Sequence, residues 1–291
     1  MKKALFIFSA IILGSIFTFG HQYTFLIRYN LMVMLFFAFL SIPFNWSIFQ
    51  KNHYIILVIN ILIPLILYTL LQPFHLTIAQ VVFVLTVVPT AAAGPVIAEI
   101  MKANILVTTG SVILTTPIIA LLLPFFLSSL LGISGDIPIL ELIVPIMSIV
   151  FIPLLISQGA LKFAPKWSTQ LRKVSFVSFP LFLTNIFIAC GNASYFVQEN
   201  LDKVKDELLI IIGLTALICI GQFRIGRFIG RTQNTLAYEL AMGRKNTMIG
   251  LWLALTYFSP IIALGPICYI VCHNIYNSFQ LWQMERVVKE G

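Results

Sequence analysis

The sequence predicts an all-α polytopic membrane protein whose ten transmembrane helices form a 5+5 inverted repeat. The first observation is composition: 59% of the 291 residues are hydrophobic and 10% are charged, against roughly 25% charged residues in soluble domains. The second is a series of ten apolar segments, each about long enough to cross a bilayer. The third is that the fourth and the ninth of these segments both contain residues that interrupt helices.

The ten segments follow one another with short connections. The first five cover residues 4–20, 23–44, 54–71, 77–101 and 105–127, and the second five cover 137–161, 174–196, 208–229, 232–258 and 260–282. We therefore treat residues 1–291 as a single transmembrane unit, with a first repeat in 1–130 and a second in 131–291. The first segment has the basic start of a secretory signal, but its apolar run exceeds the usual ~7–15 residues, so we expect a retained helix.

Lysine and arginine residues predict the orientation. The net charge of +8 does not indicate a nucleic-acid partner, because the basic residues fall singly or in pairs between apolar segments. With a cytoplasmic N-terminus, 13 basic residues fall on the cytoplasmic side and two, Lys203 and Lys205, on the outer side. This bias fits an even number of spans. It predicts a multi-pass protein of the cell (inner or plasma) membrane with both termini in the cytoplasm.

The two interrupted segments differ from the other eight. "VVPTAAAGPVIAEIM", residues 87–101, holds two prolines, which remove backbone donors and should break the helix. "LAYELAMGRKN", residues 236–246, places ionisable groups where an uncompensated charge costs roughly 2.5–3.5 kcal/mol. Interrupted segments at matching places in two halves are the sequence pattern of inverted-repeat transporters, whose broken helices cross at the membrane midplane. The alternative is that both segments are ordinary kinked spans.

The residues around both interruptions carry a family resemblance. "VVPTAAAGPVIAEIMKANILVTTGSVILTTPIIALLLPFF" is similar to the fourth and fifth helices of the bile acid:sodium symporter family, and "ELAMGRKN" with "GPICYIVCHNIYNSF" resembles its ninth and tenth helices. The resemblance implies a core domain of helices 3, 4, 5, 8, 9 and 10 and a panel domain of helices 1, 2, 6 and 7. It also implies sodium-coupled transport of organic anions.

The resemblance implies an ion site at the ninth helix. Glu239 matches a sodium ligand of the family, and Leu240 and Met242 fall where the family offers backbone carbonyls. Gly94 and Pro95, however, stand where the family has oxygen-bearing side chains. Where the family often has Gln-Asn after its Met, this chain has Gly243, Arg244 and Lys245, with Asn246 displaced. We therefore expect Lys245 or Arg244 to act as a built-in cation beside Glu239, with weak or absent sodium dependence.

Other polar residues complete the candidate site. The hydroxyls of Thr108, Ser111 and Thr115 repeat at helical spacing and either complete an ion site or pack between helices. The candidate substrate-binding residues are Thr90, Gly94, Pro95, Arg244, Lys245, Asn246, His273 and Asn274. Arg28 either faces a substrate cavity or extends to the nearby membrane surface, and we favour the second position.

These observations predict a secondary active transporter that moves small or amphipathic carboxylates by alternating access. The alternative is a facilitated or proton-coupled exporter or uniporter of a related solute. An enzyme is not expected, because Asp136, Asp202 and Asp206 all fall in outer loops and no paired acids remain for metal-assisted chemistry. No metal is assigned to Cys268 and Cys272, which suit helix packing. The expected partners are an anionic solute, the lipid bilayer and Na⁺ or H⁺ as a coupling ion, with no cofactor, and a monomer is compatible with the sequence.

Overall fold

The computed structural model describes residues 2–42, 48–131 and 139–290, which form an all-α membrane protein. Within those ranges, six helical stretches are long and apolar enough to cross a membrane, namely Lys51–Leu71, Ile105–Ser128, Leu140–Phe163, Ser175–Leu201, Glu207–Ile229 and Pro260–Gln283. Four shorter apolar helices accompany them, namely Leu5–Ile16, Phe25–Leu40, Leu76–Val87 and Thr247–Tyr257.

The elements follow the predicted segments closely. The first half contains α1 (Lys2–Ile16), the 3₁₀ helix η1 (Thr18–Tyr23), α2 (Phe25–Leu40), α3 (Lys51–Leu71), α4 (Leu76–Val87), α5 (Gly94–Ile100) and α6 (Ile105–Leu131). The second half contains α7 (Ile139–Phe163), α8 (Pro165–Lys173), η4 (Ser175–Val177), α9 (Ser178–Ile229), α10 (Thr235–Gly243), α11 (Thr247–Tyr257), η5 (Pro260–Ala263) and α12 (Leu264–Glu290). Both predicted interruptions are present, between α4 and α5 and between α10 and α11.

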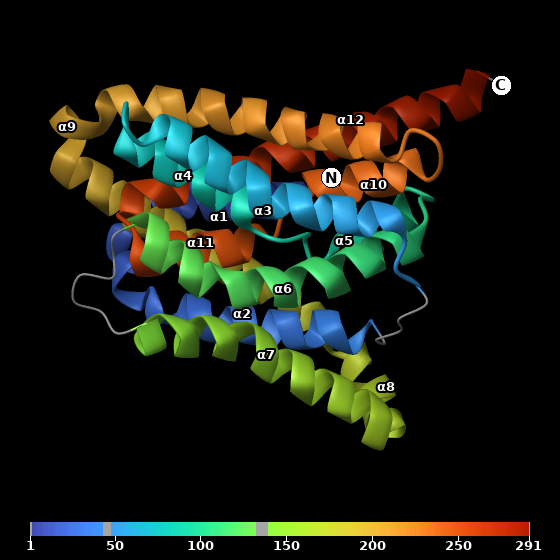
Figure 1. The fold of residues 1–291 in the computed structure, drawn as a ribbon. Helices are drawn as coiled ribbons and strands as arrows, with labels where there is room; N and C mark the ends of the chain where they lie inside the picture. Colours follow the sequence, from blue (N-terminus) through green and yellow to red (C-terminus); the bar gives the residue numbers. More distant parts are fainter. Residues whose placement is uncertain (1, 43–47, 132–138, 291) are drawn as a thin grey trace.

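The long helices run side by side across the view in Figure 1. From one side of the bundle to the other, α7 contacts α2 and α6, α6 contacts α5 and α3, α3 contacts α4, and α4 contacts α9. Most of the interrupted pairs lies inside this stack, since every residue from Val81 to Val87 and from Ala237 to Gly243 is buried. The short helix α5 is the exception, because Val96 and Ile100 are exposed.

Two connections differ from the predicted loops. Residues 197–207 contain neither Gly nor Pro, so the chain stays helical there and α9 bends at Asn200, whose φ is −131° and ψ is 21°. Residues 165–173 form the additional short helix α8, which starts with Pro165 in its first turn. The predicted segment limits at Phe44 and Ile137, and Asp136, lie outside the described residues.

Close approach of backbones holds neighbouring helices together. A Cβ added to Gly14 of α1 would meet the backbone of Phe187 on α9, and one added to Gly226 of α9 would overlap the backbone of Tyr238 on α10. Glycine is needed at both places because any side chain would separate the helices. The second contact fixes α10 against α9 beside the second interruption.

Candidate functional site

The two interruptions lie against each other and share a two-residue antiparallel bridge between Thr90 and Lys245. The Ala91 N–H donates to the Arg244 carbonyl at 2.7 Å, and the Asn246 N–H donates to the Pro89 carbonyl at 2.8 Å. Backbone groups freed by a broken helix cost several kcal/mol if they stay unpaired in a membrane. The bridge pairs four of them and joins segments that are more than 150 residues apart in sequence.

Prolines and small residues form the first interruption. Val88, directly before Pro89, has ψ of 140°, the extended conformation that a following proline favours. Pro95 lies in the first turn of α5, where its missing N–H leaves no bond unmade. Thr90 is fully buried between them, its N–H donating to Thr115 Oγ1 at 3.2 Å and its hydroxyl to the Ala241 carbonyl at 2.8 Å. This break is thus anchored to α6 and α10.

The second interruption has no proline and is held by contacts from other helices. An added Cβ at Gly243 would overlap the ring of Phe223 on α9. The hydroxyl of Tyr269, on α12, donates to the Gly243 carbonyl at 2.8 Å. Asn246 then caps α11, with its Oδ1 accepting from the Ile249 N–H at 3.3 Å. The end of α10 and the start of α11 are therefore both defined.

Lys245 is 1% exposed and forms no ion pair with Glu239. Its ammonium donates to Asn60 Oδ1 on α3 at 2.5 Å and to the Thr86 carbonyl at the end of α4 at 3.2 Å. Asn60 was not among the candidate site residues. It is nevertheless a partner of the buried Lys245 ammonium. This contact could not be predicted from the sequence, because the two residues are 185 positions apart and meet only through the packing of α3.

Glu239 is also buried, and its partner is Tyr276. The Tyr276 hydroxyl donates to Glu239 Oε1 at 2.7 Å, and the Tyr276 ring stacks on Phe223 with ring centroids 4.1 Å apart. The predicted pairing of Glu239 with Arg244 or Lys245 is not found. The ion pair found among the described residues joins His75 Nε2 and Glu207 Oε1, which are 3.4 Å apart. The pairing prediction was wrong because the chain turns at Gly243 and sends the cations elsewhere.

Arg244 is the second buried cation where the two interruptions meet, a place here called the crossing. Its backbone N–H caps α10 by donating to the Leu240 carbonyl at 3.0 Å, which uses one of the carbonyls expected at an ion site. Its Nε is buried with no hydrogen-bond partner, and it forms no ion pair with a described carboxylate. Met242, whose carbonyl was also expected at an ion site, lines an apolar cavity of about 230 Å³ together with residues of α3 and α9.

The three hydroxyls on α6 bond mainly to their own helix. Thr108, Ser111 and Thr115 donate to the carbonyls of Ile105, Val107 and Ser111, at 3.0, 3.0 and 2.7 Å. Such bonds satisfy small polar side chains inside helix packing. Thr115 has a second role, because it accepts the Thr90 N–H and so ties α6 to the first interruption.

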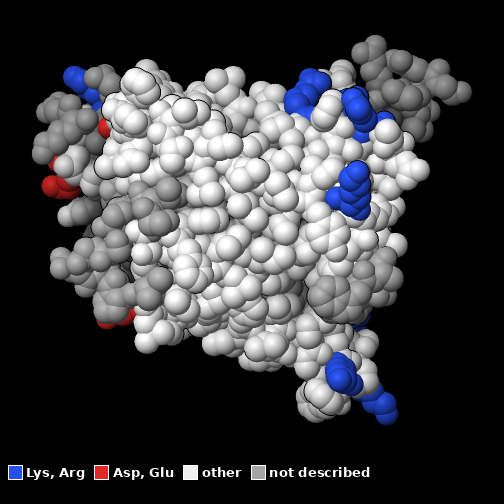
Figure 2. Space-filling model, in the orientation of Figure 1, with Lys and Arg blue, Asp and Glu red and all other residues white. Residues whose placement is uncertain are grey.

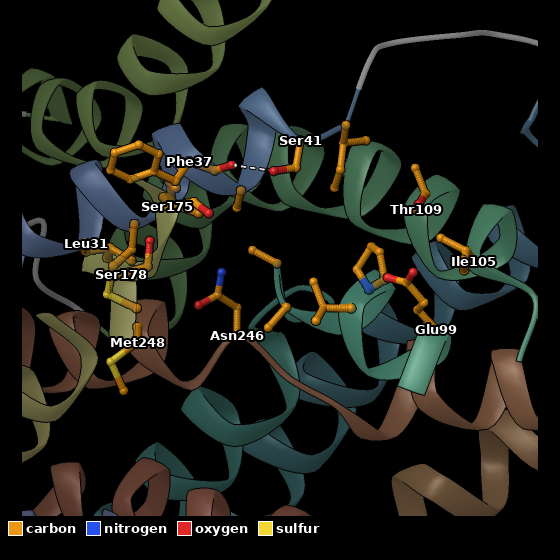
Figure 3. A pocket seen from close by; sticks show the side chains of 18 of the residues that line it. Leu31, Phe37, Ser41, Glu99, Ile105, Thr109, Ser175, Ser178, Asn246 and Met248 are labelled. Atoms are coloured by element: carbon orange, nitrogen blue, oxygen red, sulfur yellow. Dashed lines mark hydrogen bonds between the residues drawn. The ribbon is translucent and has the colours of Figure 1, made fainter. Parts of the chain in front are cut away.

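A cavity of about 610 Å³ lies beside the crossing (Figure 3). Figure 3 shows Asn246 reaching into it, with Leu31, Ser178 and Met248 toward one end and Glu99, Ile105 and Thr109 toward the other. Residues of α2, α5, α6, η4, the start of α9 and α11 line it, and most of these are apolar. Its volume is in the range of ligand pockets.

The cavity includes two of the predicted substrate-binding residues, Pro95 and Asn246. Thr90, Gly94, Arg244 and Lys245 are buried at the crossing directly behind them. His273 and Asn274 lie apart from the cavity on α12: the His273 ring contacts Tyr269 edge-on at 5.8 Å, and the Asn274 amide donates to the Ile270 carbonyl at 2.7 Å. The structure thus unites the two interruptions with a cavity and separates α12 from it.

No model of a known protein family matches the chain, and no curated protein matches it either.

Proposed function

We propose that the chain is a secondary carrier that moves an amphipathic organic anion across a membrane by alternating access. One observation carries the proposal: two interrupted helices are joined by a backbone bridge directly beside a cavity of about 610 Å³. Irregular backbone at membrane depth is tolerated where it lines a cavity or is buried in protein. In carriers with inverted repeats, the solute site lies at such a crossing.

The helix inventory supports ten spans. The six long stretches and four shorter apolar helices account for ten crossings when α4 continues through α5 and α10 continues into α11. The interrupted spans are then the fourth of each half, as an inverted repeat requires. On the face in Figure 2, Lys and Arg gather mainly at the right end and Asp and Glu at the left, with an uncharged band between them. We assign the right end to the cytoplasm.

The cavity lies between two groups of helices. On one side is α2, which contacts α7 and α9, and on the other side are α5, α6 and the start of α11. In the proposed carrier, the α2 side is the panel and the other side is the core that the bile acid:sodium symporter resemblance implies. In the proposed mechanism, the α2 side moves against the crossing and exposes the solute alternately at the two membrane surfaces.

Charge and lining together favour an amphipathic anion. At the crossing, the two buried cations Arg244 and Lys245 outnumber the one buried carboxylate, Glu239, and neither cation forms an ion pair with it. In a medium of low dielectric constant, this excess positive charge attracts an anion. Glu99 lies at the far end of the cavity (Figure 3), which places the anionic group near Asn246 and the apolar body against α2.

Coupling to sodium is not part of the proposal. The Lys245 ammonium donates to Asn60 Oδ1 and the Thr86 carbonyl, and oxygen atoms of this kind are also ligands for hard metal cations. The lysine thus fills the role of a resident cation, although its partner is Asn60 rather than Glu239. Facilitated or proton-coupled transport is the corresponding form of the carrier.

Uptake by purified protein in liposomes tests the proposal. Radiolabelled carboxylates with ring-shaped and short apolar bodies are compared with their amides and with amines of the same size. Ala38 of α2 lines the cavity, so Ala38→Phe fills it and should lower carboxylate uptake at least tenfold. Val33 of the same helix is 40% exposed and does not line it, so Val33→Phe should keep uptake. Equal uptake by both variants, or transport of amines alone, would contradict the proposal.

A further inference from the structure

A cavity of about 370 Å³, here called the second cavity, lies at the ends of α2 and α11 that are farther from the cavity of about 610 Å³, the first cavity. The N-terminal part of α2, from Thr24 to Tyr29, lines it together with Pro145 of α7 and Trp252, Leu255 and Thr256 of α11. The first cavity is lined by the later part of α2, from Leu31 to Ala38, and by Asn246 and Met248 at the start of α11. Both helices therefore line both cavities, and they run in opposite directions between them.

The stretch between the two cavities is closed. Ile27 and Leu31 of α2 and Leu251 of α11 are almost completely buried. The Asn30 amide donates to Asn185 Oδ1 at 2.8 Å, and the Asn185 amide contacts the Met248 sulfur at 3.9 Å. This layer links α2, α9 and α11. The two cavities are thus the two ends of a single helix interface, separated by side chains alone.

Arg28 gives the second cavity a positive charge, whereas the charged residue that lines the first cavity is Glu99. Its Nη2 donates to Ser148 Oγ on α7 at 2.7 Å, and that hydroxyl donates in turn to the Pro145 carbonyl at 2.8 Å. Its Nε is buried without a hydrogen-bond partner. No described carboxylate forms an ion pair with it. The partly exposed side chain thus lies on the cavity wall, where one neutral hydroxyl holds it.

We infer that this second cavity is a binding site for the carboxylate group of an amphipathic organic anion, with Arg28 as its anion-binding residue. A guanidinium presents paired donors that match the two oxygens of a carboxylate. Phe25 and Trp252 line the same cavity and supply an apolar surface for the body of the solute. The Tyr257 hydroxyl, also buried without a partner and within electrostatic reach of Arg28, is a second polar group at this end.

The inference rests on the proposed carrier function where it assigns the same solute to both cavities. Binding at Arg28 is nevertheless measurable without any transport. The site is the one from which the solute would enter or leave at the membrane surface opposite the first cavity. Its occupant is a carboxylate with an apolar body rather than an inorganic anion, because the cavity walls outside Arg28 are mostly apolar or aromatic.

Equilibrium binding of tritium-labelled 2-naphthoate tests the inference, with unlabelled 2-naphthamide as the uncharged competitor. The purified chain carries Ala38→Phe throughout, which fills the first cavity and leaves the second to be measured. Arg28→Gln should weaken naphthoate binding about tenfold or more, since a hydrogen bond to a charged group contributes about 1.5–3 kcal/mol. Arg28→Lys keeps the charge and should retain binding within about fivefold. Arg231→Gln is the matched control, because Arg231 is exposed, stacks on Phe228 and lines neither cavity. Competition by naphthamide should be the same in all of these variants.

Two further variants keep the test decisive if Arg28→Gln folds poorly. Thr256 is exposed at the cavity, so adding Thr256→Phe should block naphthoate and naphthamide together, whereas Ala38→Phe alone, in the first cavity, should leave binding at the second intact. Unchanged naphthoate affinity in both Arg28→Gln and Thr256→Phe would overturn the inference even if the protein transports carboxylates. Arg28-dependent binding in a protein that transports nothing would support the site and contradict the carrier.

Discussion

The two interrupted segments meet at one bridge, but their helices end for different reasons. α4 ends before Pro89, and α5 begins at Gly94 with Pro95 in its first turn. The prolines of the segment itself therefore cause the first break. The second break has no proline. Its geometry depends on Phe223 of α9, Tyr269 of α12 and the reach of Lys245 to α3.

This difference indicates which break responds to the rest of the molecule. The first keeps its form through local residues and carries no charge between Val88 and Ala93. The second is supported by three other helices and contains both buried cations. Any relative movement of α3, α9 or α12 therefore changes the position of a charge at the crossing. In the proposed carrier, the buried cations of the second break therefore change position when the conformation changes.

The largest effect is expected at Gly243, where the second break depends on α9. Gly243→Ala places a methyl group in the Phe223 ring, and overpacking of this kind costs about 1–3 kcal/mol in a packed core. We expect the free energy of unfolding to fall by about 2–3 kcal/mol, measured as thermal stability in detergent. The control is Gly213→Ala, since nothing lies within 4 Å of an added Cβ there; that substitution should be neutral or stabilising.

A second substitution checks the cause. If the overlap with the ring is responsible, the double variant Phe223→Ala, Gly243→Ala should lose less unfolding free energy than the two single variants lose together. Additive losses would instead mean that the first variant fails for a different reason. The second break would then be independent of α9, contrary to the comparison.

The next effect concerns the charge of the second break. Lys245→Gln removes the ammonium from Asn60 and the Thr86 carbonyl, leaving oxygen atoms that are suitable for a metal cation. We expect sodium-free uptake to fall about tenfold, equivalent to about 1.4 kcal/mol, and sodium stimulation to appear. Uptake is measured in liposomes under separate sodium and proton gradients.

Lys51→Gln is the matched control, because Lys51 is an exposed residue at the start of α3. It should leave both the rate and the sodium independence of uptake unchanged. Strong sodium stimulation of the native protein would contradict the role of Lys245 as a resident cation. So would unaltered uptake by Lys245→Gln.

The helices were predictable because hydrophobic length and proline are local signals. The apolar stretches and both interruptions appear in the structure close to their predicted positions. The surface helix α8 and the helical bend at Asn200 were not predicted, since the connections were treated as loops. Short helices in connections depend on capping and packing that hydropathy does not record.

The side-chain partners of the site were not predictable in the same way. Glu239 and the two cations lie within six residues of one another, so pairing them was the natural hypothesis. The partners are instead Tyr276 and Asn60, on helices whose rotation and depth only the packed structure defines. The contact of Arg28 with Ser148 was not predicted for the same reason, because 120 residues separate the two in sequence.

A smaller effect is expected from the support that α12 gives to the second break. Tyr269→Phe removes the bond from its hydroxyl to the Gly243 carbonyl. Interhelical hydrogen bonds in membrane proteins contribute about 0.6 kcal/mol on average and up to about 1.7, so we expect a loss of about 1 kcal/mol in unfolding free energy. Tyr54→Phe, at an exposed tyrosine on α3, should cause no loss. An equal loss in both variants would show that α12 does not support the break.

The smallest effect is expected at the first break, where local and tertiary support coincide. In Pro89→Ala the unfolded chain gains freedom, which lowers stability by about 0.5 kcal/mol. The folded chain keeps the bond from the Asn246 N–H to the residue-89 carbonyl and the bond from the Thr90 hydroxyl to the Ala241 carbonyl. Pro73→Ala, at the exposed turn between α3 and α4, controls for the gain of freedom alone. Hydrogen exchange of the Ala91 amide should stay as slow as in the native protein. A loss above about 2 kcal/mol relative to Pro73→Ala, with fast exchange at Ala91, would mean that proline alone maintains the first break and that the bridge depends on it.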